Sequence, residues 1–137
     1  MHVFSDASQA AYGACVYMKS VTQNHHVTVR LLCAKSKVSP LKPTTMPRLE
    51  LCAALLAARL GRAVLDSLRY KPDRVVHWSD STIVLAWLKN NTAQLKSFVA
   101  NRVNEIIENT KPSSWRYVPT AENPADLVFA RASTPVA

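Results

Sequence analysis

Glycines and acidic residues are scarce in this sequence of 137 residues. Glycine occurs only as Gly13 and Gly61, which excludes the glycine-rich loops that cradle phosphates. Nine acidic residues stand against 17 lysines and arginines, so the formal net charge is +8 and the pI is about 9.8. Such a basic chain favours a polyanionic partner, with nucleic acid first and an anionic membrane surface second.

Cysteines and long apolar runs are also few. The three cysteines, Cys15, Cys33 and Cys52, are widely spaced and fit neither a disulfide framework nor a paired-cysteine metal site. No apolar run reaches the roughly 18 residues of a membrane span, and the N-terminus lacks the pattern of a secretion signal. Apolar residues still make up 48% of the chain, enough for a buried core. These features predict one intracellular domain without membrane contact.

The positive charge is unevenly distributed. No acidic residue occurs between Asp6 and Glu50, whereas this stretch contains six bases: Lys19, Arg30, Lys35, Lys37, Lys42 and Arg48. A solvated basic face and a nucleic-acid contact surface are both compatible with such a stretch.

The hydrophobic pattern changes period along the chain. Short apolar segments predict five strands, at 2–7, 11–18, 27–34, 74–79 and 115–118. Apolar residues at three- and four-residue steps predict a helix of about five turns from Arg48, a short helix capped by Asp80–Ser81, and a third carrying Leu95 to Ile107. The pair Asn123–Pro124 is typical of a helix start and opens a last helix that holds Asp126.

These elements predict an α/β fold. Short turns join the first three strands, which are therefore expected to be antiparallel hairpins. The strand–helix–strand step that follows makes the later strands parallel to an early one. We therefore expect a five-stranded mixed sheet, three antiparallel strands and then parallel ones, with helices on both faces. The domain is expected to span residues 1–131, followed by a short C-terminal tail at 132–137.

Four carboxylates fall at the ends of these elements: Asp6, Glu50, Asp80 and Asp126. Taken singly, each is explained by a helix cap or a turn. If the first and fourth strands are neighbours, however, Asp6 and Asp80 point into one crevice, because sites in such sheets form at the carboxyl ends of strands. Converging carboxylates repel one another and need hard divalent cations such as Mg²⁺ or Mn²⁺. Two such ions about 4 Å apart are a known arrangement for phosphodiester cleavage.

Four motifs in this order resemble the ribonuclease H family. They are VFSDAS at 3–8 with AYGA at 11–14, MPRLEL at 46–51, WSDS at 78–81 and NPAD at 123–126. The amino-acid sequences of these motifs are most similar to those of the ribonuclease H domain of retrotransposon polyproteins of the Bel/Pao type. The resemblance covers nearly the whole chain, from His2 to Asp126.

This resemblance implies a ribonuclease H-like fold and an Mg²⁺-dependent endonuclease that hydrolyses the RNA strand of RNA–DNA hybrids during reverse transcription. By matching motif, Asp6 would bridge two Mg²⁺ ions, with Mn²⁺ as the alternative metal. Glu50 and Asp80 would hold one ion and Asp126 the other. It also implies an upstream reverse transcriptase domain as partner, and a location in the cytoplasm, a virus-like particle or the nucleus.

The resemblance also assigns candidate contacts to the hybrid. Four bases are expected to follow its phosphates: Lys35, Lys37, Lys42 and Arg48. Four polar residues beside the carboxylates are expected to donate hydrogen bonds to the sugar–phosphate backbone: Ser8, Gln9, Ser81 and Thr82.

The sequence departs from the family in three places. No histidine lies between Trp115 and Asp126, segment 89–94 is too short for an extra basic helix, and LVFAR at 127–131 replaces the usual LASRG. These departures leave open an alternative, a catalytically inactive nucleic-acid-binding module of a decayed or domesticated retroelement. A DNA-cutting transposase or integrase on the same fold is disfavoured, because those enzymes usually use three acids.

Overall fold

The computed structural model describes residues 1–40, 42, 44–90 and 94–126. Their five strands form one mixed sheet in the order β3-β2-β1-β4-β5. β1 pairs antiparallel with β2, and β2 with β3, while the β1/β4 and β4/β5 pairs are parallel. The strands are β1 (His2–Ala7), β2 (Ala11–Val21), β3 (Val27–Val38), β4 (Val76–Ser79) and β5 (Trp115–Tyr117). The predicted mixed sheet is confirmed.

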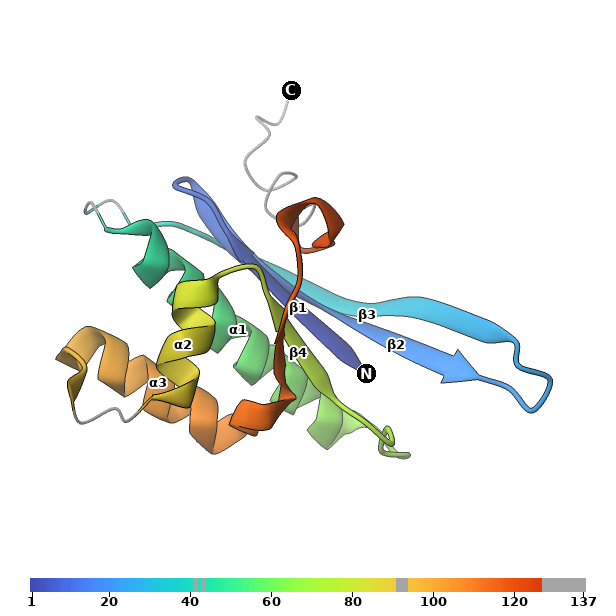
Figure 1. Ribbon diagram of the computed structural model, residues 1–137. Coiled ribbons are helices and arrows are strands. Elements are labelled where there is room, and N and C mark those ends of the chain that lie inside the picture. The colour runs from blue at the N-terminus through green and yellow to red at the C-terminus, as the bar shows by residue number, and fades with distance from the viewer. Residues whose placement is uncertain (41, 43, 91–93, 127–137) are drawn as a thin grey trace, which may run out of the picture.

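β2 and β3 are longer than the sequence predicts. Together they form a hairpin that projects beyond the rest of the sheet (Figure 1). Its far half exposes apolar side chains, with Val21 58% and Val27 53% exposed. In this half of the hairpin β2 and β3 remain paired through their backbones, although most of their side chains do not contribute to the hydrophobic core.

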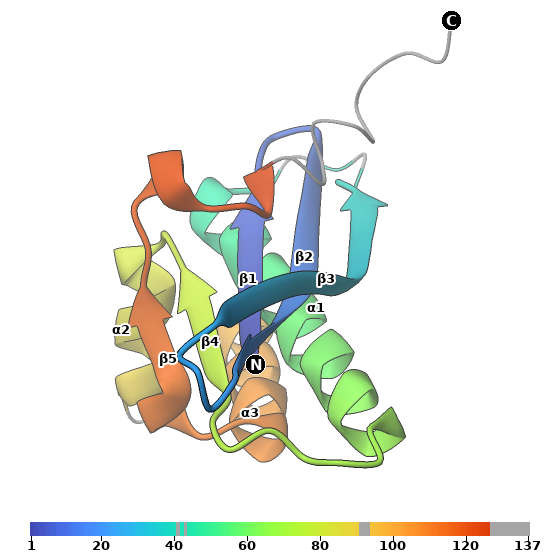
Figure 2. The ribbon, with the colours of Figure 1, turned by 90° about the vertical axis from the view of Figure 1, so that its right-hand side faces the viewer.

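Three helices lie together on one side of the sheet, behind it in Figure 2. They are α1 (Met46–Ser67), α2 (Thr82–Lys89) and α3 (Ser97–Asn109), with one-turn helices η2 (Pro112–Ser114) and η3 (Thr120–Glu122) on either side of β5. The last helix, expected to open at Asn123–Pro124 and to hold Asp126, falls mostly outside the described residues, as does the expected domain boundary at residue 131. None of the described helices is long and apolar enough to cross a membrane.

The core lies between the sheet and α1. Val3 and Val16 from the strands pack in one cluster with Leu51 of α1 and Ile106 of α3. α1 approaches β1 closely at Gly61, where an added Cβ would lie 3.2 Å from a methyl carbon of Val3. Gly61 therefore allows α1 to lie directly on the strand that carries Asp6.

The parallel pairing of β1 and β4 positions the candidate site. Ser5 is the register partner of Ser79, so the next residues, Asp6 and Asp80, leave the same edge of the sheet. α1 begins nearby at Met46, two residues earlier than predicted, which places Glu50 just past its first turn. Sheet and helix together therefore bring three of the four predicted carboxylates to one edge.

Candidate functional site

All four predicted carboxylates line a single pocket of about 370 Å³. They come from four separate segments: the end of β1, the second turn of α1, the β4–α2 connection and the segment after η3. The carboxylate pocket is lined by Asp6, Ala7, Ser8, Met46, Glu50, Asp80, Thr120 and Asp126. Within the part of the chain that the structure describes, no three acidic, histidine or cysteine side chains already converge as metal ligands. The carboxylates surround the pocket instead.

Asp6 is the most buried of the four, with only 6% of its surface exposed. Its Oδ1 accepts a 2.8 Å hydrogen bond from the Ala7 backbone N–H. Burial above all, and then the neighbouring charges of Asp80 and Asp126, raise the pKa of Asp6 to about 7. Near neutral pH this carboxyl group therefore favours a proton or a cation beside it.

Glu50 lies in the same electrostatic environment. Burial raises the pKa of Glu50, the hydroxyl of Ser81 opposes that rise, and the charge of Asp80 adds to it. Ser81 is itself buried and caps α2, because its Oγ accepts a 3.2 Å hydrogen bond from the N–H of Val84. The predicted cap is confirmed, and the Ser81 hydroxyl faces protein groups.

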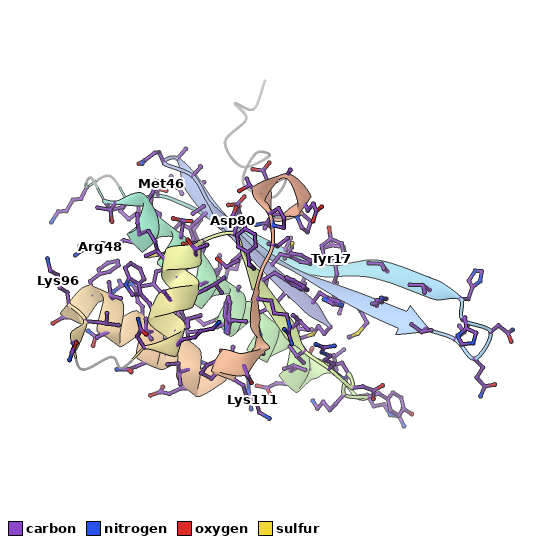
Figure 3. The ribbon with its side chains drawn as sticks, in the orientation of Figure 1. Tyr17, Met46, Arg48, Asp80, Lys96 and Lys111 are labelled. Carbon is purple, nitrogen blue, oxygen red and sulfur yellow. The ribbon has the colours of Figure 1, made fainter. Side chains whose placement is uncertain are left out.

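Asp80 is held by Thr120, which lines the same pocket. Its Oδ2 accepts a 3.2 Å hydrogen bond from the hydroxyl of Thr120 in η3. Sequence reasoning missed Thr120, because 40 residues separate the two partners and no local pattern marks the pairing. Thr120 fixes the carboxylate at the rim of the pocket, where Figure 3 labels Asp80.

Asp126 is exposed, and Asn123 connects its segment to the sheet. The buried side chain of Asn123 donates a 2.9 Å hydrogen bond from Nδ2 to the carbonyl oxygen of Ser5. Its Oδ1 accepts a 3.1 Å bond from the N–H of Ala125. The sequence indicated a helix cap at Asn123, but not this tether to β1.

Loss of the tether is expected to misplace Asp126. We predict that Asn123→Ala lowers the rate of the hybrid cleavage that the family resemblance implies by about 10- to 100-fold, because an ångström-scale displacement of a reacting group has an effect of this size. Its cost in folding stability is expected to be about 1–3 kcal/mol, the penalty for an unsatisfied buried carbonyl. Cleavage kinetics and urea unfolding measure the two effects, with Asn104→Ala on the exposed side of α3 as control. Equal activities of the two variants would contradict the tether.

The predicted nucleic-acid contacts are more dispersed than the acids. Of the eight, only Ser8 lines the carboxylate pocket, and its hydroxyl also closes the β1–β2 turn by donating to the carbonyl of Ala11. Gln9 and Thr82 are exposed beside it, at that turn and at the start of α2. The three predicted lysines, Lys35, Lys37 and Lys42, are exposed at or just beyond β3.

Arg48, the last predicted contact, stacks on Phe98 at the start of α3. Its guanidinium carbon lies 4.8 Å from the centre of the Phe98 ring. Figure 3 shows Arg48 on the same side of the molecule as Lys96, the residue before α3. Arg48 and Lys96 therefore place two bases near the starts of α1 and α3.

The sequence of this chain matches a family model described as the Pao retrotransposon-like RNaseH-like domain over residues 1–81. The matched part contains Asp6, Glu50 and Asp80 and stops before Asp126. No curated protein sequence gives a significant match.

Two solved structures share the fold. The crystal structure of RNase H1 from the halophilic archaeon Halobacterium salinarum NRC-1 aligns with a TM-score of 0.62 and 18% identity, covering 93% of this chain and 92% of that chain. The N-terminal RNase H domain of a Mycobacterium tuberculosis protein, solved as a fusion with maltose-binding protein, gives 0.61 and 13%, covering 97% and 99%. At these identities the likeness shows the fold alone.

Proposed function

Because the chain belongs to the Pao retrotransposon-like RNaseH-like domain family, we propose that it is a metal-dependent endonuclease that hydrolyses the RNA strand of RNA–DNA hybrids. The observation that carries this proposal is the arrangement of four carboxylates, from four separate segments, around one pocket. Folding alone gives no reason to gather them, since burial and the charges of Asp80 and Asp126 raise the pKa of Asp6 and so disfavour its ionised form. A cationic cofactor and a phosphodiester substrate supply that reason.

The donor set fits Mg²⁺ or Mn²⁺. Asp6, Glu50, Asp80 and Asp126 offer only carboxylate oxygens, the ligands that hard divalent cations prefer. In the proposed arrangement Asp6 would contribute to holding both ions, Glu50 and Asp80 would contribute to one, and Asp126 to the other. When bound, two such ions supply an activated water and stabilise the leaving oxygen in phosphodiester hydrolysis.

The protein's own groups orient these acids. The N–H of Ala7 fixes one oxygen of Asp6, Thr120 fixes one oxygen of Asp80, and Asn123 ties the Asp126 segment to β1. Ser81 supports Glu50 from within the protein. Such fixed positions matter because catalysis requires the reacting groups to be aligned before reaction.

Exposed groups around the pocket are proposed to bind the hybrid. Ser8 lines the pocket, and Gln9 and Thr82 are exposed at the β1–β2 turn and at the start of α2. Their proposed role is to donate hydrogen bonds to the sugar–phosphate backbone, including the 2′-hydroxyl that marks RNA. Arg48 and the lysines of β3 would add salt-sensitive phosphate contacts. In a retrotransposon polyprotein we expect a reverse transcriptase domain upstream, and reverse transcription would place the reaction in the cytoplasm, a virus-like particle or the nucleus.

A strand-resolved cleavage assay tests the proposal. Duplexes of one sequence, as RNA–DNA, RNA–RNA and DNA–DNA, are labelled on each strand in turn and incubated with the chain and Mg²⁺ or Mn²⁺. We expect cuts only in the RNA strand of the hybrid. Cutting of the DNA strand would contradict the proposal. Hybrid binding without cutting would contradict it as well, and would favour the inactive nucleic-acid-binding module.

A further inference from the structure

A second hollow, of about 310 Å³, lies beside α1 on the side where α3 packs. Tyr12 and Lys37 line it from paired positions on β2 and β3. Its other walls include Cys52 and Arg59 from α1 and Arg102 from α3. We call this hollow the α1–α3 groove.

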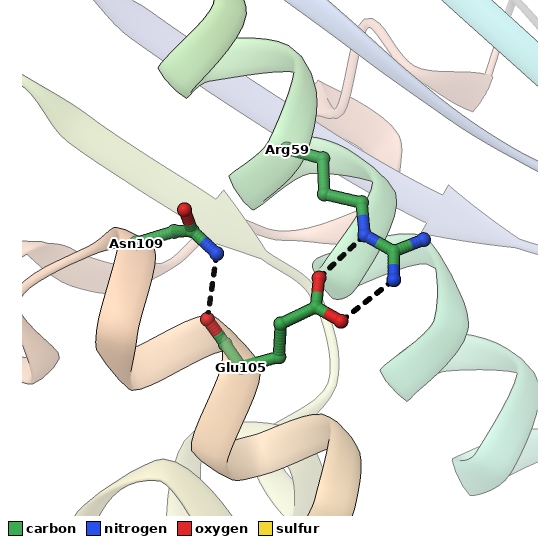
Figure 4. A network of polar contacts seen from close by, with 3 residues as sticks. All are labelled: Arg59, Glu105 and Asn109. Atoms are coloured by element: carbon green, nitrogen blue, oxygen red, sulfur yellow. Dashed lines mark hydrogen bonds and ion pairs between the residues drawn. The ribbon is translucent and has the colours of Figure 1, made fainter.

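The groove carries unbalanced positive charge. Its only acidic lining residue is Glu105, which is already paired: Arg59 Nε and Nη2 lie 2.5 and 2.6 Å from the two Glu105 oxygens (Figure 4). Among the residues that the structure describes, neither Arg102 nor Lys37 forms an ion pair. Two cations therefore remain available to an anion.

Arg102 is held in place for such a contact. Its guanidinium lies over the ring of Phe98, 3.5 Å from the ring centre, and Nη1 donates a 3.1 Å hydrogen bond to the Phe98 carbonyl. Arg48 stacks on the same ring. A guanidinium has five N–H donors, and within the described residues only one donor of Arg102 is used. Two like charges on one ring favour an anion nearby.

Among the described residues, the groove and the carboxylate pocket share no lining residue, but both take residues from α1. Met46 lines the pocket, Arg48 follows two residues later, and Arg59 reaches the groove. At about 1.5 Å per residue, Arg48 and Arg59 are separated by about 16 Å along the helix. That length matches about five base-pair steps of a duplex at about 3.4 Å each.

We propose that the α1–α3 groove binds the phosphodiester backbone of a nucleic-acid strand next to the carboxylate pocket, with Arg102 and Lys37 as the phosphate contacts and Phe98 orienting Arg102. This inference rests on the proposed function, since the strand is part of the same hybrid.

Binding measurements without metal test the groove separately from cleavage. Fluorescence anisotropy with a labelled hybrid in chelator compares Arg102→Gln and Lys37→Gln with Arg62→Gln, a matched control on α1 that pairs with Asp66 outside the groove. Each groove variant is expected to bind about 10-fold more weakly and to lower the salt slope of binding by about one. The control is expected to stay within about twofold of wild type.

Cys52 offers a second readout, because it lines the groove and is only half-buried. In a Cys33→Ser background the remaining thiol, Cys15, is fully buried with a pKa raised to about 12, so it does not compete for alkylation. Saturating hybrid is expected to slow alkylation of Cys52 at least about fivefold. Single-stranded DNA and single-stranded RNA as separate probes identify which strand protects it.

Unchanged alkylation together with equal binding by Arg102→Gln and Arg62→Gln would overturn the groove proposal, even if hybrid cleavage is normal. Groove binding with no cleavage would instead overturn only the proposed enzymatic function. Thermal unfolding of each variant confirms that the compared proteins are folded.

Discussion

Asp80→Asn is expected to lower the rate of hybrid cleavage at least about 1,000-fold, equivalent to about 4 kcal/mol of transition-state stabilisation. The amide keeps the size of the side chain and can still accept the hydrogen bond from Thr120. It removes the negative charge that Asp80 places beside Asp6 and Glu50, and with it one proposed metal ligand. The loss is therefore chemical and not structural.

Hybrid binding by Asp80→Asn is expected to be unchanged or tighter, because one charge that repels phosphate is gone. Anisotropy in chelator measures binding, and single-turnover cleavage in Mg²⁺ measures the rate. Asp66→Asn is the matched control, since Asp66 is an exposed acid on α1 paired with Arg62. A variant at position 80 that retains more than about a tenth of wild-type cleavage would show that the metal assignment is wrong.

Asp6→Asn is expected to stabilise the metal-free protein at pH 8 by about 2 kcal/mol. The pKa of Asp6 is raised to about 7 in the folded state from an ordinary value of 3.8, so between these values the folded state binds more protons than the unfolded state. Unfolding free energy contributed by this group therefore falls as pH rises through that window. The amide that the variant carries at position 6 cannot ionise, so the free energy of unfolding of the variant does not fall in this way.

Urea unfolding of wild type and Asp6→Asn at pH 4 and pH 8 in chelator measures the effect. Burial lowers the pKa of His77 to about 4, which changes stability in the opposite direction over part of this range, but it affects both proteins equally. The difference between them is expected to vanish at pH 4. Adding Mg²⁺ at pH 8 should stabilise wild type more than the variant. Equal gains with Mg²⁺, or an Asn variant less stable than wild type at pH 8, would contradict the proposed site.

The sheet and the family could be predicted well from the sequence. The bounds of β1 agree with the predicted 2–7, and every residue of this central strand is buried or half-buried. The four motifs indicated the Pao-type ribonuclease H family, and the match over residues 1–81 confirms it. Secondary structure is predicted most accurately for segments that are buried in the core.

Elements away from the core were predicted less well. The ends of β2 and β3 are stabilised by strand pairing in an exposed hairpin, which leaves no periodic signal. β4 begins at Val76 and not at Arg74, although Arg74 continues the apparent strand in the sequence. Leu95 was assigned to the third helix, but α3 begins at Ser97.

The acids of the site could be proposed from their positions at element ends, whereas their supports could not. Thr120 and Asn123 act on partners 40 and 118 residues away, and only the folded chain reveals such contacts. Phe98 falls within the third predicted helix, and nothing in the sequence marks it as a partner of an arginine. Its role under Arg48 and Arg102 depends on α1 and α3 packing together.

The central claim, that the four carboxylates form a metal-dependent ribonuclease site, is tested most directly by the rate of RNA-strand cleavage as a function of Mg²⁺ concentration. One hybrid carries a label on the RNA strand, and the titration begins in chelator. The account predicts no cleavage without metal and a rate that rises with Mg²⁺ until the site is saturated. Cleavage at an unchanged rate in chelator, or none at any Mg²⁺ or Mn²⁺ concentration by a folded chain that binds the hybrid, would contradict it.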